Sequence, residues 1–154
     1  MSKDIYKLIK EKPFILAPMD DVTDIAFREL CEEHGTCYST TELTSVESLI
    51  RDKVPKSRYE RGRLKRNQVQ LFGNKPESFA KAAEYVDTEA DAIDVNFGCP
   101  SVTVTGNDCG SSLLKDPKNV GKIIEKLVKS TDKPVSAKIR LGYKKTTYME
   151  VVFL

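Results

Sequence analysis

Residues 91–100 combine a short apolar run with side chains that can do chemistry. They read Asp-Ala-Ile-Asp-Val-Asn-Phe-Gly-Cys-Pro. The apolar run predicts a buried parallel strand, and the asparagine, glycine and proline after it predict that the strand ends in a loop. In α/β folds the carboxyl ends of such strands carry the chemistry. Because that end supplies the amide of Asn96 and the thiol of Cys99, Cys99 is the first candidate for a reacting group.

The other metal-ligating and nucleophilic side chains are few. Cys31, Cys37, Cys99 and Cys109 include no Cys-x-x-Cys pair, and His34 is the only histidine, so no zinc site or other metal site is expected. Cys109 competes with Cys99 for the reacting role, but its Asn-Asp-Cys-Gly setting predicts a turn and ranks it lower. Taken alone, Cys99 also fits a buried small apolar residue, which is the commoner role of cysteine.

Alternating helix and strand patterns must position these residues. Helices are predicted over residues 3–11, over 23–35 with Thr23 or Asp21 near the cap, over 76–86, over 117–130 and from Thr146 onward. Strands are predicted over residues 14–17, 37–45, 68–72, 92–97 and 135–141. Strict alternation implies parallel strands joined by right-handed crossovers. An open doubly wound sheet and part of a closed eight-stranded barrel both fit, although no Gly-x-Gly-x-x-Gly follows the first strand, which argues against a dinucleotide-binding sheet.

Composition narrows the class of protein. The chain has 154 residues, 40% of them hydrophobic and 31% charged, which predicts one soluble globular domain. No stretch approaches 18 consecutive apolar residues, so no membrane span is expected. The first residues lack the apolar core of a signal peptide, and we therefore expect a cytoplasmic protein.

Positive charge is concentrated in residues 51–66. This basic segment holds eight lysines or arginines against two acidic residues, whereas the whole chain carries a net charge of only +2. Its low apolar content predicts a loop. Such a loop is either simply solvated or, with a nucleic-acid substrate, in contact with phosphates.

Motifs at several predicted strand ends occur together, and in this order, in one family. They are Ala17-Pro18-Met19 with Val22-Thr23-Asp24 and Phe27-Arg28, Thr41-Glu42, Gln70-Leu71-Phe72-Gly73, Asn96-Phe97-Gly98-Cys99-Pro100, Gly110 with Leu113-Leu114, and Lys138-Ile139-Arg140. Over residues 13–143 the sequence resembles the tRNA dihydrouridine synthases, flavoenzymes that reduce uridine in tRNA.

The resemblance implies an α/β fold, a partial TIM (β/α)₈ barrel containing about the first five β/α units. We then expect five parallel strands in sequential order with helices on the outside only, and Ile15, Val69, Ile93 and Ala137 buried. It also implies FMN as cofactor, NADPH as reductant and tRNA as partner. A barrel of this type needs roughly 200 to 250 residues. The C-terminal half of the barrel and a helical tRNA-binding domain are therefore expected to be absent from residues 1–154.

The resemblance also assigns roles to individual residues. Cys99 matches the thiol that protonates C5 of uracil after a hydride reaches C6, a role that suits thiols because they titrate near about pH 8.5 and stay protonated at neutral pH. The implied flavin contacts are Ala17, Pro18 and Met19 beneath the ring, Gln70 at its pyrimidine edge and Lys138 near N1 and the C2 carbonyl. Asn96 and Arg140 are the implied substrate contacts.

Two other readings of the chain stay open at this point. One is a related flavin barrel that acts on a free pyrimidine, such as a dihydroorotate dehydrogenase. The other is a non-catalytic remnant that binds RNA weakly. If the barrel is incomplete, we expect impaired activity, and self-association or a need for the missing half, because two strand edges would be exposed.

Overall fold

The strands form one parallel sheet that follows the order of the sequence. The computed structural model describes residues 9–143. Its strands are β1 (Ile15–Leu16), β2 (Tyr38–Thr40), β3 (Thr44–Ser45), β4 (Asn67–Phe72), β5 (Ala92–Asn96) and β6 (Val135–Lys138). The sheet order is β1-β2-β4-β5-β6, with β3 also paired to β4, and every pairing is parallel. The parallel pairing predicted from the alternation is therefore confirmed, and so is the sequential order that the resemblance implies.

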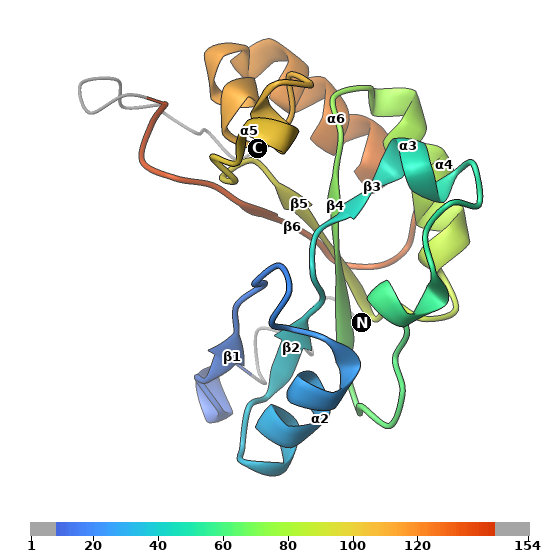
Figure 1. Cartoon of the computed structure of the whole chain (residues 1–154), viewed down its shortest axis with the longest axis vertical. Coiled ribbons are helices and arrows are strands. Elements are labelled where there is room, and N and C mark those ends of the chain that lie inside the picture. The colour runs from blue at the N-terminus through green and yellow to red at the C-terminus, as the bar shows by residue number, and fades with distance from the viewer. Residues whose placement is uncertain (1–8, 144–154) are drawn as a thin grey trace.

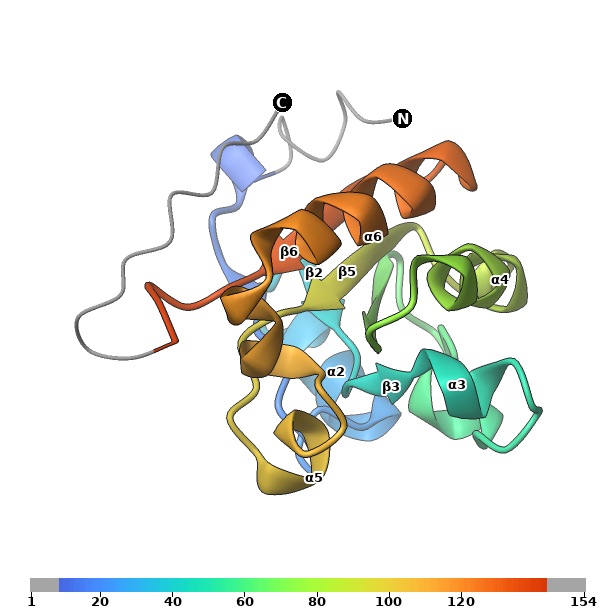
Figure 2. The same cartoon turned by 90° about the horizontal axis from the view of Figure 1, so that it is seen from above.

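Helices cover the outside of this curved sheet. They are α2 (Ile25–Glu33), α3 (Val46–Leu49), α4 (Pro76–Val86) and α6 (Pro117–Lys129). Figure 2 shows α6, α4 and α3 arranged around the outer side of the strands. Pro76 and Pro117 occupy the first turns of α4 and α6, where a missing backbone N–H costs nothing. The arrangement is a partial (β/α)₈ barrel, as the resemblance implies, and not the open doubly wound sheet that the alternation also allowed.

Short helical elements fill the connections at the ends of the strands. They are the 3₁₀ turn η1 (Lys56–Arg58) in the basic segment, and α5 (Val102–Thr105) and the 3₁₀ helix η2 (Gly110–Lys115) after β5. Figure 1 shows α5 at the end of β5, on the side to which the carboxyl ends of β4 and β5 run. Within residues 9–143, no helix combines the length and the apolar character needed to cross a membrane.

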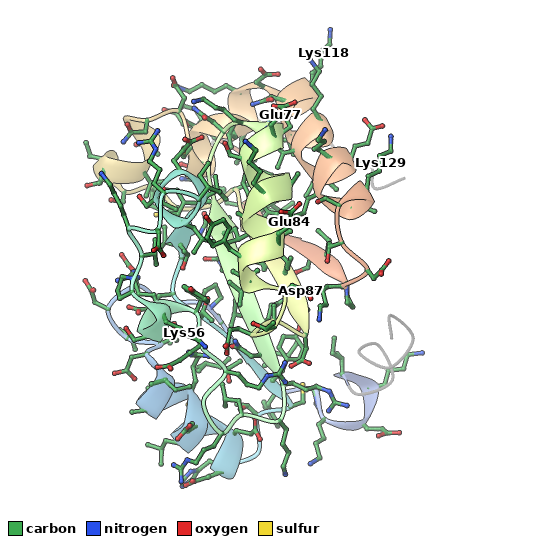
Figure 3. The ribbon with its side chains drawn as sticks, turned by 90° about the vertical axis from the view of Figure 1, so that its right-hand side faces the viewer. Lys56, Glu77, Glu84, Asp87, Lys118 and Lys129 are labelled. Atoms are coloured by element: carbon green, nitrogen blue, oxygen red, sulfur yellow. The ribbon has the colours of Figure 1, made fainter. Side chains whose placement is uncertain are left out.

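The hydrophobic core lies between the sheet and α3, α4 and α6. Its fully buried members come from one face of β4 and β5 and from the facing sides of the helices: Val46, Val69, Leu71, Phe79, Ala82, Val86, Ile93, Val95, Ile123 and Leu127. Glu77 and Glu84 on α4 and Lys118 and Lys129 on α6 lie on the opposite, solvent side (Figure 3). The apolar stripes of these helices therefore fix which face of the sheet they cover.

The other face of β4 and β5 is polar, although it is buried as well. Gln68 and Gln70 alternate with the apolar residues of β4, and Asp94 and Asn96 alternate with those of β5; all four are buried. Parallel strands covered on both faces are usually apolar on both. A buried polar face in the barrel interior therefore needs a hydrogen-bonding explanation.

The predicted strand over residues 37–45 is wrong as a single element. The structure has two short strands, β2 and β3, separated by Thr41, Glu42 and Leu43. Between them the Thr41 side chain takes over part of the ladder, because Thr41 Oγ1 accepts a 3.0 Å hydrogen bond from Gln70 N. A side-chain oxygen thus replaces a backbone carbonyl where the chain leaves the sheet.

The outer strands are shorter and more exposed than predicted. Ile15 is 38% exposed and Ala137 is half-buried, so the expected burial holds only for Val69 and Ile93. Strand β6 ends at Lys138, and Leu141 beyond it is 85% exposed. The cause is position: within the described residues β1 pairs only with β2, and β6 only with β5.

The N-cap of α2 also differs from the prediction. Asp24 is the cap, and its Oδ1 accepts a 2.8 Å hydrogen bond from Phe27 N. Thr23 instead bonds to both the N–H and the carbonyl of Met19. Of the helix predicted over residues 3–11, only helical residues 9–11 are described, and the helix predicted from Thr146 lies outside the described residues.

Candidate functional site

Gln70 and Asp94 form the centre of the candidate site. They face each other in the parallel register of β4 and β5. Gln70 Nε2 donates a 2.7 Å hydrogen bond to Asp94 Oδ2. Burial raises the pKa of Asp94 above its ordinary value, while the hydrogen bonds from Gln70 and Ser136 and the charge of Lys138 oppose that shift. The carboxylate is therefore buried but well supplied with donors.

Asn96 connects this centre to the loop that carries the thiol. Its Nδ2 donates to Gln70 Oε1 at 3.0 Å. Its Oδ1 accepts from Gly98 N at 3.1 Å and from Cys99 N at 2.9 Å. Residues 97–100, the Cys99 loop, are thus held by a side chain from the last position of β5. Cys99 is partly exposed at the carboxyl end of that strand.

A turn at Gly110 supports the same loop from behind. Ser111 N donates a 2.9 Å hydrogen bond to the Cys99 carbonyl. Gly110 has φ +57°, and a Cβ built there would lie 2.7 Å from the Cys99 carbonyl oxygen and 2.8 Å from Val104 Cγ1. Only glycine combines this conformation with this close approach. The Cys99 loop is therefore held by the Asn96 side chain and by the turn at Gly110.

A second set of hydrogen bonds reaches Asp94 from the other strands. Thr40 Oγ1 donates to Gln68 Oε1 at 2.8 Å, and Gln68 Nε2 donates to Ser136 Oγ at 2.8 Å. Ser136 Oγ in turn donates to Asp94 Oδ1 at 2.5 Å. These contacts cross β2, β4, β6 and β5. They account for the buried polar face of the sheet.

The two basic candidates lie beside the Cys99 loop. Lys138 pairs with Asn96 in the register of β5 and β6, and Phe97 N donates to the Lys138 carbonyl at 2.9 Å. Both Lys138 and Arg140 are exposed, with Arg140 just past the end of β6. The structure therefore brings Gln70, Asn96, Cys99 and Lys138 together at the carboxyl ends of adjacent strands.

The predicted contacts after β1 lie farther along the sheet. Ala17 and Met19 are exposed and Pro18 is partly buried, so all three are accessible from solvent. The turn itself uses the Met19 carbonyl, which accepts hydrogen bonds from Val22 N and Thr23 N. Because β2 separates β1 from β4, these residues border the site from the side opposite Lys138.

Cys109 is poorly placed for chemistry. It is buried, and its thiol donates a 3.2 Å hydrogen bond to the Asn107 carbonyl. Burial, together with the negative charges of Asp108 and Glu47, raises the pKa of Cys109 to about 11. A buried thiol with a raised pKa gives up its proton less readily than a partly exposed one.

Most arginines of the basic segment are paired with carboxylates of this chain. Those within ion-pair distance of a carboxylate are Arg51 with Glu47, Arg58 with Asp20, Arg61 with Asp91 and Arg63 with Glu29. Lys56 pairs with Glu89 at 2.7 Å. Arg51, Lys56 and Arg63 remain largely exposed, so the segment is solvated, but its charges are mostly paired and the charge available to a phosphate is smaller than the sequence suggested.

One carboxylate cluster has the spacing of a possible cation site. Oxygens of Asp20, Asp21 and Glu42 lie within 4.8 Å of one another. Arg58 Nη2 already contacts Asp20 at 2.5 Å, and Arg58 Nη1 lies 4.0 Å from Glu42. Glu42 also accepts a 2.6 Å hydrogen bond from Asp21 N. The cluster is thus partly neutralised by an arginine and serves to anchor η1 to the loop after β1.

Two surface cavities lie away from the thiol. One of about 230 Å³ is lined by Thr44, Ser45, Ser48, Lys53, Arg58 and Phe72 among others, near the ends of β3 and β4. One of about 200 Å³ lies between α2 and residues 63–65. Neither is lined by Cys99, Gln70 or Lys138.

Asp94 is the residue that sequence reasoning missed. The sequence pattern places it only within an apolar strand. The sequence could have pointed to it, because an acidic residue in the middle of a predicted buried strand must be paired or functional. The partners could not be inferred, since Gln70 and Ser136 lie on other strands.

Comparisons with known proteins match this chain to one family. A family model described as dihydrouridine synthase (Dus) matches residues 15–153. A probable tRNA-dihydrouridine synthase of Rhizobium leguminosarum bv. phaseoli is 40% identical over 131 residues, 84% of this chain and 41% of that protein. One of Aquifex aeolicus is 36% identical over 149 residues, 93% of this chain and 47% of that protein.

A relative with a more specific name matches as well. The tRNA-dihydrouridine synthase B of Pasteurella multocida is 36% identical over 135 residues, 84% of this chain and 40% of that protein. This chain therefore spans about two fifths to one half of the length of these curated relatives.

Proposed function

This chain belongs to the dihydrouridine synthase family, and we propose that it forms the first part of a catalytic barrel that reduces uridine in tRNA to dihydrouridine. FMN is the proposed cofactor and NADPH the proposed reductant. The proposed substrate follows from the relatives, which are named as tRNA-dihydrouridine synthases. We therefore propose a tRNA substrate in place of the alternative, a flavin barrel that acts on a free pyrimidine.

The placement of Cys99 is the single observation that carries this proposal. A partly exposed thiol lies at the carboxyl end of β5, beside the Asn96 amide and next to the strand that bears Lys138. The ends of β5 and β6 therefore supply an acid (Cys99), a hydrogen-bond donor (Asn96) and a cation (Lys138). Reduction of a carbon–carbon double bond conjugated to a carbonyl uses these three groups.

The proposed reaction adds a hydride to C6 and a proton to C5 of uracil. When bound, the flavin would supply the hydride. Cys99 holds the proton for C5 and is left as a thiolate after transfer. Cys109 does not replace it, because that thiol is buried and its pKa is raised to about 11. A water proton then restores the Cys99 thiol.

Asn96 is proposed to orient the base. Its Oδ1 is occupied by two backbone N–H groups, and one Nδ2 hydrogen is used by Gln70. The remaining Nδ2 hydrogen can only donate, so Asn96 suits a carbonyl oxygen of uracil rather than an amino group. Arg140, exposed beyond β6, is proposed to contact the same base or a nearby phosphate.

FMN is proposed to bind along the carboxyl ends of the strands, between residues 17–19 after β1 and Lys138 at the end of β6. Met19 and Lys138 are both exposed, so an apolar group on one side and an ammonium group on the other are accessible. Lys138 would place positive charge near N1 and the C2 carbonyl, and residues 17–19 would lie beneath the ring. Gln70 is fully buried, with Oε1 bonded to Asn96 and Nε2 bonded to Asp94, so it is not exposed for the contact with the pyrimidine edge that the resemblance implies.

An activity measurement tests the proposal. The chain would be joined to the C-terminal part of the Aquifex aeolicus relative and incubated with unmodified tRNA, FMN and NADPH, with dihydrouridine read by mass spectrometry. We expect Cys99→Ala to retain NADPH oxidation and to lose roughly a hundredfold or more of uridine reduction. Cys109→Ala is the matched control and should reduce tRNA normally.

Two outcomes would contradict the proposal. Normal reduction by Cys99→Ala would assign the proton to another group. Reduction of free orotate instead of tRNA would assign the chain to a different flavin chemistry.

A further inference from the structure

The hydrogen bonds of the buried polar face have a common direction. In one arm, Gly98 N and Cys99 N donate to Asn96 Oδ1, and Asn96 Nδ2 donates to Gln70 Oε1. Gln70 Nε2 then donates to Asp94 Oδ2. Every donor in this arm points toward Asp94.

The second arm ends at the same residue. Thr40 donates to Gln68, Gln68 donates to Ser136, and Ser136 donates to Asp94 Oδ1. Each oxygen of the carboxylate therefore terminates one arm. A carboxylate is the only ionisation state of this side chain that offers two acceptors and no donor.

Both ends of the first arm require the same orientation of its amides. Backbone N–H groups can only donate, so Asn96 Oδ1 must face the Cys99 loop. Asn96 Nδ2 then faces Gln70, whose oxygen must receive it, and Gln70 Nε2 is left to face Asp94. A hydrogen-bond donor at position 94 would break this series of hydrogen bonds at its last contact, because it would face the Nε2 donor of Gln70.

We propose that Asp94 is a positioning residue for the Cys99 loop, acting through Gln70 and Asn96 as the terminal acceptor of both arms. Asp94 does not contact the substrate in this proposal. It keeps the amide of Asn96 turned so that its oxygen holds Gly98 N and Cys99 N. The inference rests on the proposed function of Cys99, but its test does not require activity.

The test exchanges the acceptor between two strands. Gln70→Glu places two carboxylates against each other, and Asp94→Asn removes the charge that ends both arms. The double variant Gln70→Glu/Asp94→Asn restores a single acceptor, because the carboxylate moved to β4 would receive both the Asn96 amide and the new amide at position 94. Ser39→Ala is the matched control, since Ser39 is buried in β2 and its hydroxyl has no partner within the described residues.

Two readouts by mass spectrometry are used on the full chain. One is hydrogen exchange of the Gly98 and Cys99 amides against the Leu71 and Val95 amides in the core strands. The other is the alkylation rate of Cys99 against that of Cys31, on α2. We expect Gln70→Glu to accelerate both at the Cys99 loop by about tenfold, Asp94→Asn to do so less, and the double variant and Ser39→Ala to stay near the original chain.

The contrary results are distinct from each other. Unchanged exchange and alkylation in both single variants would overturn the proposal. So would a double variant that is worse than either single variant, because the two residues would then not act on each other. Acceleration that is equal at Leu71 and Val95 would show a role in overall stability only. Loss of uridine reduction with none of these changes would count against the role of Asp94 but not against Cys99.

Discussion

Arg28 Nη1 donates a 2.6 Å hydrogen bond to Asn67 Oδ1 in a fully buried contact between α2 and the start of β4. The same guanidinium donates to the carbonyls of Thr23 and Glu60 at 3.1 and 3.0 Å. Burial lowers the pKa of Arg28, and nearby carboxylates, first Glu60, oppose that shift. One side chain thus joins α2, the basic segment and β4.

Arg28→Met should destabilise the fold strongly. It leaves three acceptors without this donor, and each such buried group costs about 1–3 kcal/mol, so we expect a loss of about 3 kcal/mol or more in the free energy of unfolding, measured by urea titration. Arg63→Met is the control, because Arg63 is an exposed arginine paired with Glu29, and its midpoint should hardly change. Equal effects of the two substitutions would show that the Arg28 contacts add little.

Two glycine substitutions should have opposite effects. Gly110→Ala forces a Cβ against the Cys99 carbonyl at positive φ, so we expect a loss of about 1–3 kcal/mol and faster alkylation of Cys99. Gly121→Ala lies in α6 with nothing within 4 Å of the added Cβ, and we expect a gain of about 0.5–1 kcal/mol. Thermal unfolding and thiol alkylation measure both. A neutral Gly110→Ala would contradict the close packing of the Cys99 loop.

The pH dependence of stability should report the buried carboxyl of Asp94. Its pKa in the folded chain is raised, so the folded state binds more protons than the unfolded state between the ordinary value of about 3.9 and the raised value. The stability that this group contributes is therefore fully present below about pH 3.9 and is lost as pH rises through the folded pKa. The hydrogen bonds from Gln70 and Ser136, and after them the positive charge of Lys138, oppose the rise in pKa and so limit this loss.

Comparison with Asp94→Asn isolates this effect. Urea unfolding would be measured from about pH 3 to about pH 8. The variant should gain stability relative to the original chain between the ordinary and the raised pKa of Asp94, and the difference should be constant at higher pH. Glu47 and Glu89, whose pKa values are lowered, respond in both proteins and cancel. A difference that does not vary with pH would mean that Asp94 has no raised pKa.

Binding of tRNA should depend on Lys53 more than on the outer helices. Lys53 is exposed and lines the cavity near the ends of β3 and β4, together with Arg58 and Phe72. If a phosphate lies there, Lys53→Glu should weaken tRNA binding and reduce its dependence on salt. Lys118→Glu changes the charge equally but lies on the outer surface of α6 (Figure 3). Filter binding at several salt concentrations measures the affinity for tRNA. Equal weakening by Lys53→Glu and Lys118→Glu would indicate only a general effect of charge.

The chain of 154 residues should associate with itself through its outer strands. Phe14 is 74% exposed and Leu141 is 85% exposed, and they flank β1 and β6, which each pair on one side only within the described residues. Light scattering after size-exclusion chromatography should show a mass that grows with concentration. Phe14→Lys should reduce it, because charged residues on an edge strand oppose pairing. A monomer at all concentrations would contradict this prediction.

Local patterns in the sequence determined much of the fold. The alternation of elements, the starts of α4 and α6 at Pro76 and Pro117, and the end of β5 before the Cys99 loop are all encoded within a few residues of where they occur. Breakers and periodicity act over one or two turns, so one sequence suffices to find them. The sequence alone therefore places the Cys99 thiol at the carboxyl end of a strand, because that position depends only on where its own strand ends.

The tertiary structure decided which side chains meet. Gln70 and Asp94 are 24 residues apart, and Arg28 and Asn67 are 39 apart, and only the register of neighbouring strands and the packing of α2 bring them together. The same holds for the basic segment, whose arginines pair with acids from α2, α3 and the loop before β5. Sequence periodicity carries no information about such partners, because pairing across strands is fixed by the sheet and not by spacing along the chain. The role of Asp94 could therefore be read only from the structure.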